Sequence, residues 1–328
     1  MSTVAATVEA VVDAAGLHVR PLMASLEQRL AELAGGHGED LARHGGDTIA
    51  AGGKRLRPLV VFVAAGHLPG DGGLGLVRAA AAVELVHSAT LVHDDVLDAA
   101  DLRRGRPTVV ASGGRAIATA TGDLLFSRAF AELARNGRHD EVRALSAASS
   151  ALARGELLQR ADAFDVGVTV ERYLRRCELK TARLFEAACR LGALEGGAGA
   201  ARVGELAAFG RRIGMAFQLL DDILDVFGPA ERTGKRRGTD LLDGTVTLPL
   251  ILARQRSAEL ARLDPHTLTG TAQAEAVCEA IEATGALEEA RRMALEMVAE
   301  ARTALPRLPR TQLRALHLIA DGVVDRYA

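Results

Sequence analysis

One arrangement of aspartates occurs twice in this chain. The motifs are HDDVLD, with Asp94, Asp95 and Asp98, and LDDILD, with Asp221, Asp222 and Asp225. On a helix, the first and last aspartates of each motif lie one turn apart on one face, where their carboxylates can hold hard cations. Magnesium suits such sites because it takes one or two carboxylates and lets a substrate phosphate complete its coordination. A single motif could equally be a charged helix end, but two copies indicate two acidic walls around metal ions and a diphosphate.

Basic residues stand in two glycine-containing segments that suit anion binding. Arg103 and Arg104 follow the first aspartates in LRRGRP, and Lys54, Arg55 and Arg57 lie in GGKRLRP. Planar guanidinium groups bind phosphate through paired hydrogen bonds, and glycines let backbone N–H groups approach an anion. The alternative for GGKRLRP is a solvated basic helix start.

Lysine is rare in this chain. Of the 40 basic residues only Lys54, Lys180 and Lys235 are lysines. Because every other basic position holds arginine, these three lysines indicate places that need a compact ammonium group as a phosphate ligand. The alternative is that the three lysines occur by chance. His87 lies two turns before Asp94 on the same helical stripe, so it either reaches the same site or is a satisfied core histidine.

The elements that must position these residues are helices. Apolar residues recur at helical spacing almost throughout, and strand-like alternation is scarce, which predicts an all-α fold. Glycine- and proline-rich breakers near Gly35, Pro69, Gly196 and Asp264 delimit helices of roughly ten to twenty-five residues. No long polar linker interrupts the chain, so we expect a single domain over residues 1–328 with a motif-bearing core at about 52–249.

Composition narrows the function classes. Hydrophobic residues make up 48% of the 328 residues, charge interrupts every apolar run, and no membrane-spanning segment is expected. The amino terminus has no basic region that would indicate a signal peptide, so a cytoplasmic protein is expected. A net charge of -2 and 3% aromatic residues give no reason to expect nucleic acid as a partner. The three cysteines form no metal-binding pair or disulfide framework.

Five motifs in order carry a resemblance to a known family. GGKRLRP, HDDVLDAADLRRGRPT, the Lys180–Thr181 pair, FQLLDDILD, and GKRRGTD followed by TLP resemble those of the trans-isoprenyl diphosphate synthases, or polyprenyl synthetases, from Gly52 to Pro249. The resemblance implies a helical bundle around a deep central apolar cavity, the isoprenoid synthase type I fold, in a homodimer. It also implies magnesium-dependent addition of isopentenyl diphosphate to an allylic diphosphate such as geranyl or farnesyl diphosphate.

The resemblance also implies roles for individual residues. Magnesium, with three ions in each site, would be bound directly by Asp94, Asp98 and Asp221 and supported by Asp95, Asp222 and Asp225. The allylic diphosphate would be held by Arg103, Lys180, Gln218 and Lys235. Isopentenyl diphosphate would be held by Lys54, Arg57, His87 and Arg104. Thr181 would lie near the reacting carbon.

Two small residues bear on product length. In the resembling family, bulky aromatic residues four or five positions before the first aspartate pair stop the growing tail early, and here these positions hold Thr90 and Ala89. We therefore expect a polyprenyl diphosphate of thirty carbons or more. The alternative is a geranylgeranyl diphosphate synthase, in which another residue closes the cavity at twenty carbons.

Other classes fit less well. A terpene cyclase typically lacks the second aspartate motif and lines its cavity with aromatics, whereas this chain has no Trp and two Tyr. A non-catalytic partner subunit of a heteromeric synthase tends to lose an acidic motif, and both are intact here. A purely structural bundle has no need of six aspartates on apolar helices.

Overall fold

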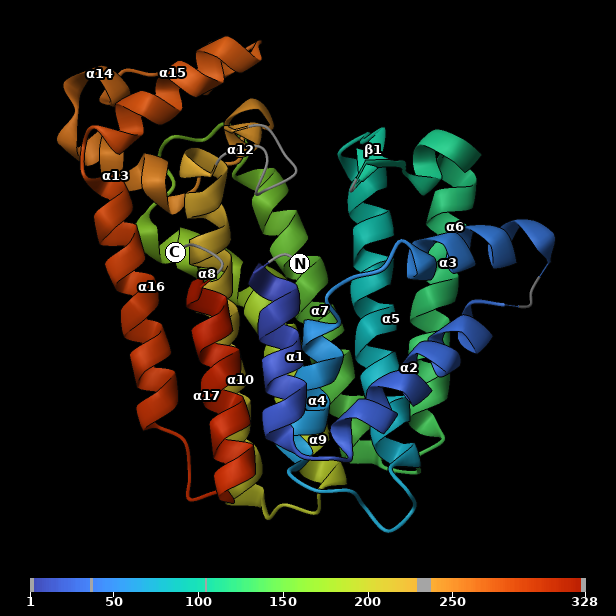
Figure 1. The fold of residues 1–328 in the computed structure, drawn as a ribbon. Coiled ribbons are helices and arrows are strands. Elements are labelled where there is room, and N and C mark those ends of the chain that lie inside the picture. The colour runs from blue at the N-terminus through green and yellow to red at the C-terminus, as the bar shows by residue number, and fades with distance from the viewer. Residues whose placement is uncertain (1–2, 36–37, 104, 229–236, 326–328) are drawn as a thin grey trace. The chain divides into compact units, whose positions relative to one another are not determined.

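The computed structural model describes residues 3–35, 38–103, 105–228 and 237–325, and these are almost entirely helical (Figure 1). The all-α prediction is confirmed. The chain divides into two compact units, which are described separately. Unit 1 comprises Met1–Ser149, Leu184–Gly210 and Ala304–Gly322, and unit 2 comprises Ser150–Arg183, Arg211–Thr303 and Val323–Ala328.

The elements of unit 1 are helices and one short hairpin. They are α1 (Thr3–Ala15), α2 (Val19–Ala34), α3 (Glu39–Ala50), α4 (Leu56–Ala65), α5 (Leu74–Leu97), β1 (Leu102–Arg103), β2 (Arg106–Pro107), α6 (Val109–Ala134), α9 (Arg183–Glu195) and α17 (Arg310–Asp325). Unit 2 holds α8 (Val170–Cys177), the π-helix η1 (Glu178–Ala182), α12 (Thr239–Leu242), α13 (Leu248–Arg256), α14 (Ala258–Ala261), the 3-10 helix η2 (Pro265–Thr267), α15 (Thr271–Glu282) and α16 (Ala286–Thr303). The unit boundaries cross α7 (His139–Ala161) and α10 (Ala200–Phe227), and they also pass through the first turn of α9 and the last turn of α17.

Helix α5 forms the core of unit 1. Its middle is apolar on every side, and Leu76, Ala80, Val83 and Leu85 have no exposed surface. A helix that is apolar all round is buried all round, and α5 packs against α2, α4 and α6. By length and mean hydropathy α5 could cross a membrane, which the sequence analysis did not predict because charged residues interrupt its apolar residues. However, 78% of its most apolar stretch is buried in the protein. Packing within the unit therefore accounts for its composition.

Close approach of α4 and α9 requires glycine. A methyl group at Gly192 would lie 2.0 Å from the carbonyl oxygen of Val61, which is far inside van der Waals contact. The two helix backbones can touch only because this position lacks a side chain. Leu59, Val61 and Phe62 of α4 have no exposed surface.

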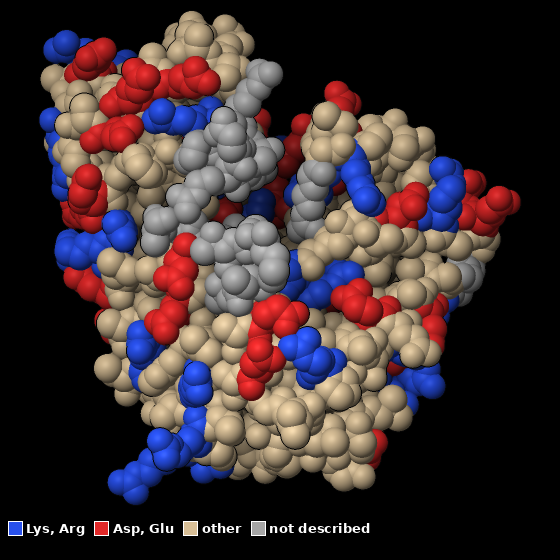
Figure 2. Space-filling model, in the orientation of Figure 1, with Lys and Arg blue, Asp and Glu red and all other residues tan. Residues whose placement is uncertain are grey.

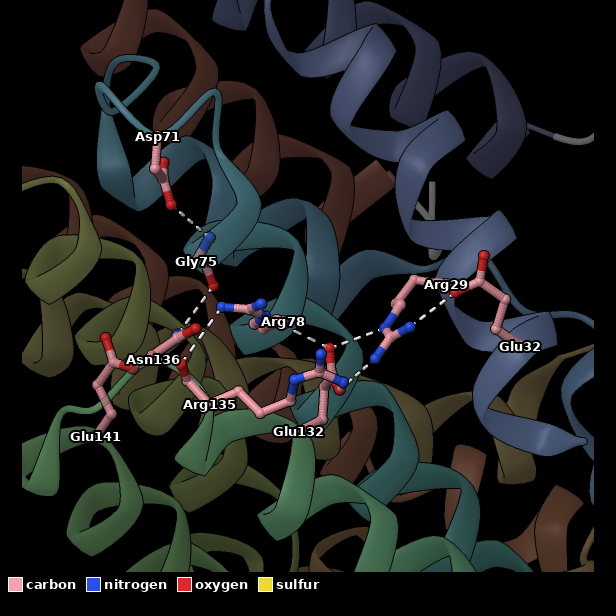
Figure 3. Close-up of polar contacts among 9 residues, drawn as sticks. All are labelled: Arg29, Glu32, Asp71, Gly75, Arg78, Glu132, Arg135, Asn136 and Glu141. Carbon is pink, nitrogen blue, oxygen red and sulfur yellow. Dashed lines mark hydrogen bonds and ion pairs between the residues drawn. The ribbon is translucent and has the colours of Figure 1, made fainter. Parts of the chain in front are cut away.

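A buried carboxylate ties three helices of unit 1 together (Figure 3). Glu132 on α6 is only 2% exposed. Its two oxygens accept hydrogen bonds from Nε and Nη2 of Arg29 on α2, at 2.8 and 2.6 Å. Arg78 on α5 approaches within 3.8 Å. Because burial strengthens such pairs, this cluster fixes α2 and α5 against α6.

Beside this cluster lies a second buried carboxyl group. The Asn136 amide nitrogen donates to the Gly75 carbonyl and to Glu141 Oε2, each at 3.0 Å (Figure 3). Glu141 has no exposed surface. Burial and the adjacent Glu195 carboxyl raise the pKa of Glu141 from 4.5 to about 9. Folding therefore favours the protonated form of Glu141 by raising its pKa.

In unit 2, a buried aspartate joins α7 to α8. Asp162 is 1% exposed and pairs with Arg172 Nε at 2.6 Å and Arg176 Nη1 at 3.7 Å. Arg176 also donates to the carbonyl of Val246 at 2.6 Å and stacks 5.4 Å over the ring of Tyr173. These contacts fix α8, and with it the π-helix that follows.

The proton on Glu141 predicts how stability depends on pH. The folded protein holds this proton between about pH 4.5 and 9, whereas the unfolded chain has released it, so the free energy of unfolding should fall as pH rises through that window. We expect a contribution of about 1 kcal/mol per pH unit, measured by urea unfolding. Glu141→Gln should remove that contribution, and Glu39→Gln, at an exposed position on α3, should not. An unchanged slope in Glu141→Gln would contradict the assignment.

Candidate active site

The first aspartate motif ends α5. The Asp98 backbone N–H donates to the carbonyl of Asp94 at 2.8 Å, so the two residues lie one turn apart. Asp94 is half-buried and Asp98 is exposed, whereas Asp95 is 4% exposed. Ala99 has a left-handed backbone (φ 49°), which ends the helix directly after the motif.

A hairpin after the motif returns a cation to it. Strands β1 and β2 pair Arg103 with Arg106, and the Thr108 hydroxyl closes the turn by donating to the carbonyl of Ala100 at 2.5 Å. Arg103 Nε and Nη2 both lie 2.8 Å from Asp95 Oδ1. The guanidinium thus balances the least exposed of the three carboxylates. Arg104, predicted to bind isopentenyl diphosphate, lies outside the described residues.

The basic segment before α4 contains arginines with different surroundings. Arg55 is 8% exposed and binds Glu27 through Nε at 2.7 Å and Glu84 through Nη1 at 2.8 Å. Arg57 is half-buried and stacks 4.6 Å over the Phe185 ring. Arg55 therefore has a structural role: its ion pairs join α2 and α5 to the start of α4. The basic motif in the sequence did not indicate this role.

A cavity of about 300 Å³ opens in unit 1 beside the motif. Predicted residues His87, Asp95 and Arg103 line it together with Arg55 and Glu84. The structure also brings in four residues of α3 that the sequence analysis did not single out: Arg43, His44, Asp47 and Thr48. A charged pair one helical turn apart, just before a glycine-rich basic loop, is the signal that could have indicated them.

The two residues predicted to set product length differ in burial. Ala89 has no exposed surface, and Thr90 is half-buried with its hydroxyl donating to the carbonyl of His87 at 2.7 Å. The lining of the 300 Å³ cavity includes their neighbours Ser88, Leu91 and Val92 instead.

The second motif lies in unit 2, on the last turns of α10. Asp221 is exposed and Asp225 half-buried, whereas Asp222 is 5% exposed. Asp222 accepts hydrogen bonds from the Tyr173 hydroxyl and from the Gln218 amide, each at 2.7 Å. Burial and the neighbouring Asp240 carboxylate nevertheless raise the pKa of Asp222 to about 7. The second motif thus contains one buried carboxyl group, that of Asp222, and two carboxyl groups that are at least partly exposed.

A π-helix presents two of the predicted residues. Lys180 and Thr181 lie in η1, where Gly155 of α7 comes so close that a methyl group there would lie 2.6 Å from the backbone nitrogen of Lys180. Lys180 forms an ion pair with Glu156. Thr181 donates to Gln218 Oε1 at 2.5 Å, and this bond continues the hydrogen-bond chain that leads to Asp222. Single π turns inside helices are frequent at functional sites.

In unit 2 the structure therefore brings Lys180, Thr181, Gln218 and Asp222 together through α7, η1 and α10. Lys235, predicted to hold the allylic diphosphate, lies outside the described residues. Tyr173, Glu156 and Asp240 contact these residues and were not predicted, because nothing in the sequence pattern marks them. Among the described residues, no three His, Cys, Asp or Glu side chains converge closely enough to hold an ion by themselves. The carboxylates of the two aspartate motifs suit magnesium, which takes few carboxylates and keeps other oxygen ligands.

Comparison with known proteins defines the class. Residues 39–284 match the polyprenyl synthetase family. The chain is 41% identical over 272 residues to heptaprenyl diphosphate synthase component 2 of Geobacillus stearothermophilus, covering 82% of this chain and 84% of the relative. It is 38% identical over 283 residues to octaprenyl diphosphate synthase of Escherichia coli (85% and 87% covered). Synthases of shorter prenyl chains are also similar to it.

The fold agrees with these relatives. A polyprenyl synthase from Caulobacter crescentus, solved with calcium and isoprenyl diphosphate, superposes with a TM-score of 0.90 at 35% identity, covering 97% of this chain and 98% of that one. Such a site and fold define an isoprenoid diphosphate synthase. This chain belongs to the polyprenyl synthetase family and is a trans-prenyltransferase. Members of the family depend on divalent metal ions and use isopentenyl and allylic diphosphates.

Neighbouring cations in GGKRLRP should respond differently to substitution. Arg55→Ala leaves the buried Glu84 without its guanidinium and should lower the free energy of unfolding by about 3 kcal/mol. Lys54→Ala removes an exposed side chain and should change it by less than about 0.5 kcal/mol. Urea unfolding of both variants checks this contrast. Equal losses in the two variants would mean that Arg55 has no special structural role.

Proposed function

We propose that this protein is a magnesium-dependent synthase that adds isopentenyl diphosphate to an allylic diphosphate and forms an all-trans polyprenyl diphosphate of thirty carbons or more. One observation carries the proposal: this member of the family has both aspartate motifs, each at the carboxyl end of a long helix, α5 or α10. Geranyl and farnesyl diphosphate are the proposed starters. The long-chain names of two relatives support the product length.

The accessible carboxylates are the proposed metal ligands. Asp98 and Asp221 are exposed and Asp94 is half-buried, and we assign these three residues to three magnesium ions in each site. The buried Asp95 and Asp222 and the half-buried Asp225 act through water or neighbouring groups. Bound magnesium supplies positive charge that makes diphosphate a better leaving group.

Two of the proposed ligand cations are held, each within its own unit, by carboxylates that a substrate can replace. Arg103 rests on Asp95 and Lys180 on Glu156, so both are oriented before the allylic diphosphate arrives. Gln218 is oriented by Thr181 and Asp222, and Lys235 completes this proposed set. A preformed orientation reduces the conformational entropy lost on binding.

Isopentenyl diphosphate is assigned to the other cations. Lys54, Arg57, His87 and Arg104 are proposed to hold it. Stacking on Phe185 restricts the guanidinium of Arg57, and the exposed Lys54 ammonium can approach a phosphate as a point charge.

Carbon–carbon bond formation needs no protein nucleophile. The bond between the allylic carbon and the diphosphate oxygen breaks, the alkene of isopentenyl diphosphate attacks the resulting cation, and a proton passes to the departing diphosphate. Thr181 lies near the reacting carbon in this proposal, where its oxygen favours positive charge. Apolar walls keep water from the cation.

We further propose that the described units form one domain, that the protein is cytoplasmic, and that it acts as a homodimer. One relative is named as a component, so a heteromeric synthase is the competing assembly. Turnover by the purified chain alone, given magnesium and both diphosphates, distinguishes the two, because a partner-dependent subunit would be inactive by itself.

Loss of either metal wall should stop the reaction. Asp94→Ala and Asp221→Ala should each lower kcat by about a thousandfold or more, because each removes charge from the metal site. Circular dichroism should show both variants folded, and chelation of magnesium should abolish wild-type activity. A variant that keeps more than about a tenth of the wild-type rate would exclude its carboxylate as an essential ligand.

The two substrates should separate kinetically. Lys54→Ala should chiefly raise KM for isopentenyl diphosphate, because it removes a ground-state phosphate contact. Lys180→Ala should act on the allylic substrate. Steady-state kinetics with each substrate varied in turn measures both effects, and a raised allylic KM in Lys54→Ala would reverse the assignment.

Product length should respond to bulk at Ala89. Its side chain is completely buried about one turn below Asp94, so Ala89→Tyr should shorten the product while turnover is retained. Chromatography of the extracted products measures this, with Ala116→Tyr at an exposed position on α6 as control. A wild-type product of twenty carbons, or an unchanged longer product in Ala89→Tyr, would refute the proposed path.

A further inference from the structure

Five chain connections meet at one end of unit 1 (Figure 1). We call this the loop end and define it as residues 13–22, 65–76, 134–143, 194–202 and 304–314. Contacts join the connections: a methyl group at Gly66 would lie 2.6 Å from Gln312 Oε1, and the Asn136 amide donates to the Gly75 carbonyl at 3.0 Å. A methyl group at Gly196 would lie 2.4 Å from the Ala65 carbonyl. The loop end is therefore one continuous surface.

Three leucines protrude from the loop end. Leu17 is 97% exposed, Leu68 45% and Leu74 49%. The α1–α2 turn and the α4–α5 loop adjoin, since a methyl group at Gly73 would contact side chains from both, Leu22 at 2.7 Å and Leu68 at 2.8 Å. Figure 2 shows few charged side chains over these two connections, at the lower end of the view. Exposed apolar groups collected on one surface indicate an interaction site.

Arginines accompany the leucines. The five segments contain eight arginines, no lysine and five acidic residues, whereas the chain as a whole has a net charge of -2. Arg307, Arg310 and Arg314 are exposed and form no ion pair with the described residues. Arg310 and Arg314 lie one turn apart at the start of α17, where each opposes the helix dipole and repels the other. Helix stability does not explain their placement.

We propose that the loop end docks on an anionic lipid surface, with the leucines entering the headgroup boundary and the arginines binding lipid phosphates. This inference rests on the proposed function, because a product with a tail of thirty carbons or more must pass from the protein into a bilayer. Helix α5 carries Asp94 near one end and Leu74 at the other, about 30 Å apart, so the loop end lies away from the diphosphate groups.

Charge complementarity favours a lipid surface. Arg307, Arg310 and Arg314 are exposed and can meet a surface of lipid phosphates. Separate protruding leucines can insert into a fluid surface without a complementary partner shape.

Vesicle co-sedimentation tests the proposal. We expect the purified protein to bind phosphatidylcholine vesicles that contain about one-third phosphatidylglycerol at least tenfold more tightly than vesicles of phosphatidylcholine alone. Binding should be lost in about 1 M salt, where charge is screened within about 3 Å.

Matched variants locate the contact. Arg310→Ser with Arg314→Ser should weaken binding to the anionic vesicles by about thirtyfold, and Leu17→Ser with Leu68→Ser by about tenfold or more. The controls are Arg262→Ser with Arg291→Ser, which removes two exposed arginines elsewhere, and Leu157→Ser, at a leucine that is 70% exposed. These controls should bind as wild type does, and circular dichroism should show every variant folded.

Equal binding to both vesicle types, or equal losses in variants and controls, would overturn the proposal. So would an absence of vesicle binding together with self-association that Leu17→Ser abolishes, because the loop end would then be an interface between copies. Synthase activity in detergent is measured separately. Activity without vesicle binding refutes docking alone, and vesicle binding without any synthase activity refutes the proposed function.

Discussion

Holding carboxylates of like charge on apolar helices is the constraint on which the rest of this structure depends. Each motif places three aspartates within five residues, where they repel one another and lose water. The most buried carboxyl group of each motif is compensated in a different way in the two units. Arg103 balances Asp95, whereas Asp222 receives hydrogen bonds from Tyr173 and Gln218 and has a raised pKa. In both motifs the least exposed carboxyl is compensated, which leaves the more exposed ones to bind cations.

Burial also distinguishes structural cations from those proposed to bind ligands. Arg55 is buried between Glu27 and Glu84, and Arg29 is joined to Glu132, so guanidinium groups serve as cross-links between helices. An arginine remains charged when buried and binds a carboxylate through two nitrogens, whereas a lysine loses its proton more readily. That difference gives a physical reason for lysine to be confined to a few positions in an arginine-rich chain.

The sequence predicted the fold class and the placement of the aspartates on helices, because helical periodicity and breakers are local signals. It grouped Arg55 with Lys54 and Arg57, since adjacent basic residues look alike until their partners are known. The sequence analysis did not identify Tyr173 or the cavity-lining residues Arg43 and His44, because these residues reach the sites only through tertiary packing. The roles assigned by resemblance to Lys180 and Gln218 remain predictions, although the structure gives both of them defined partners.

The π-helix between α8 and α9 has a consequence for how this chain can change in length. A π turn amounts to one residue inserted into an α-helix, and each residue turns a regular helix by about 100°. Removing any one residue of Glu178–Ala182 would restore a regular helix but rotate everything on one side by that angle. A deletion between Tyr173 and Thr181, which both lie in unit 2, would leave these two side chains unable to face Asp222 and Gln218 together. Homologous sequences should therefore align through this segment without gaps, even where individual residues differ.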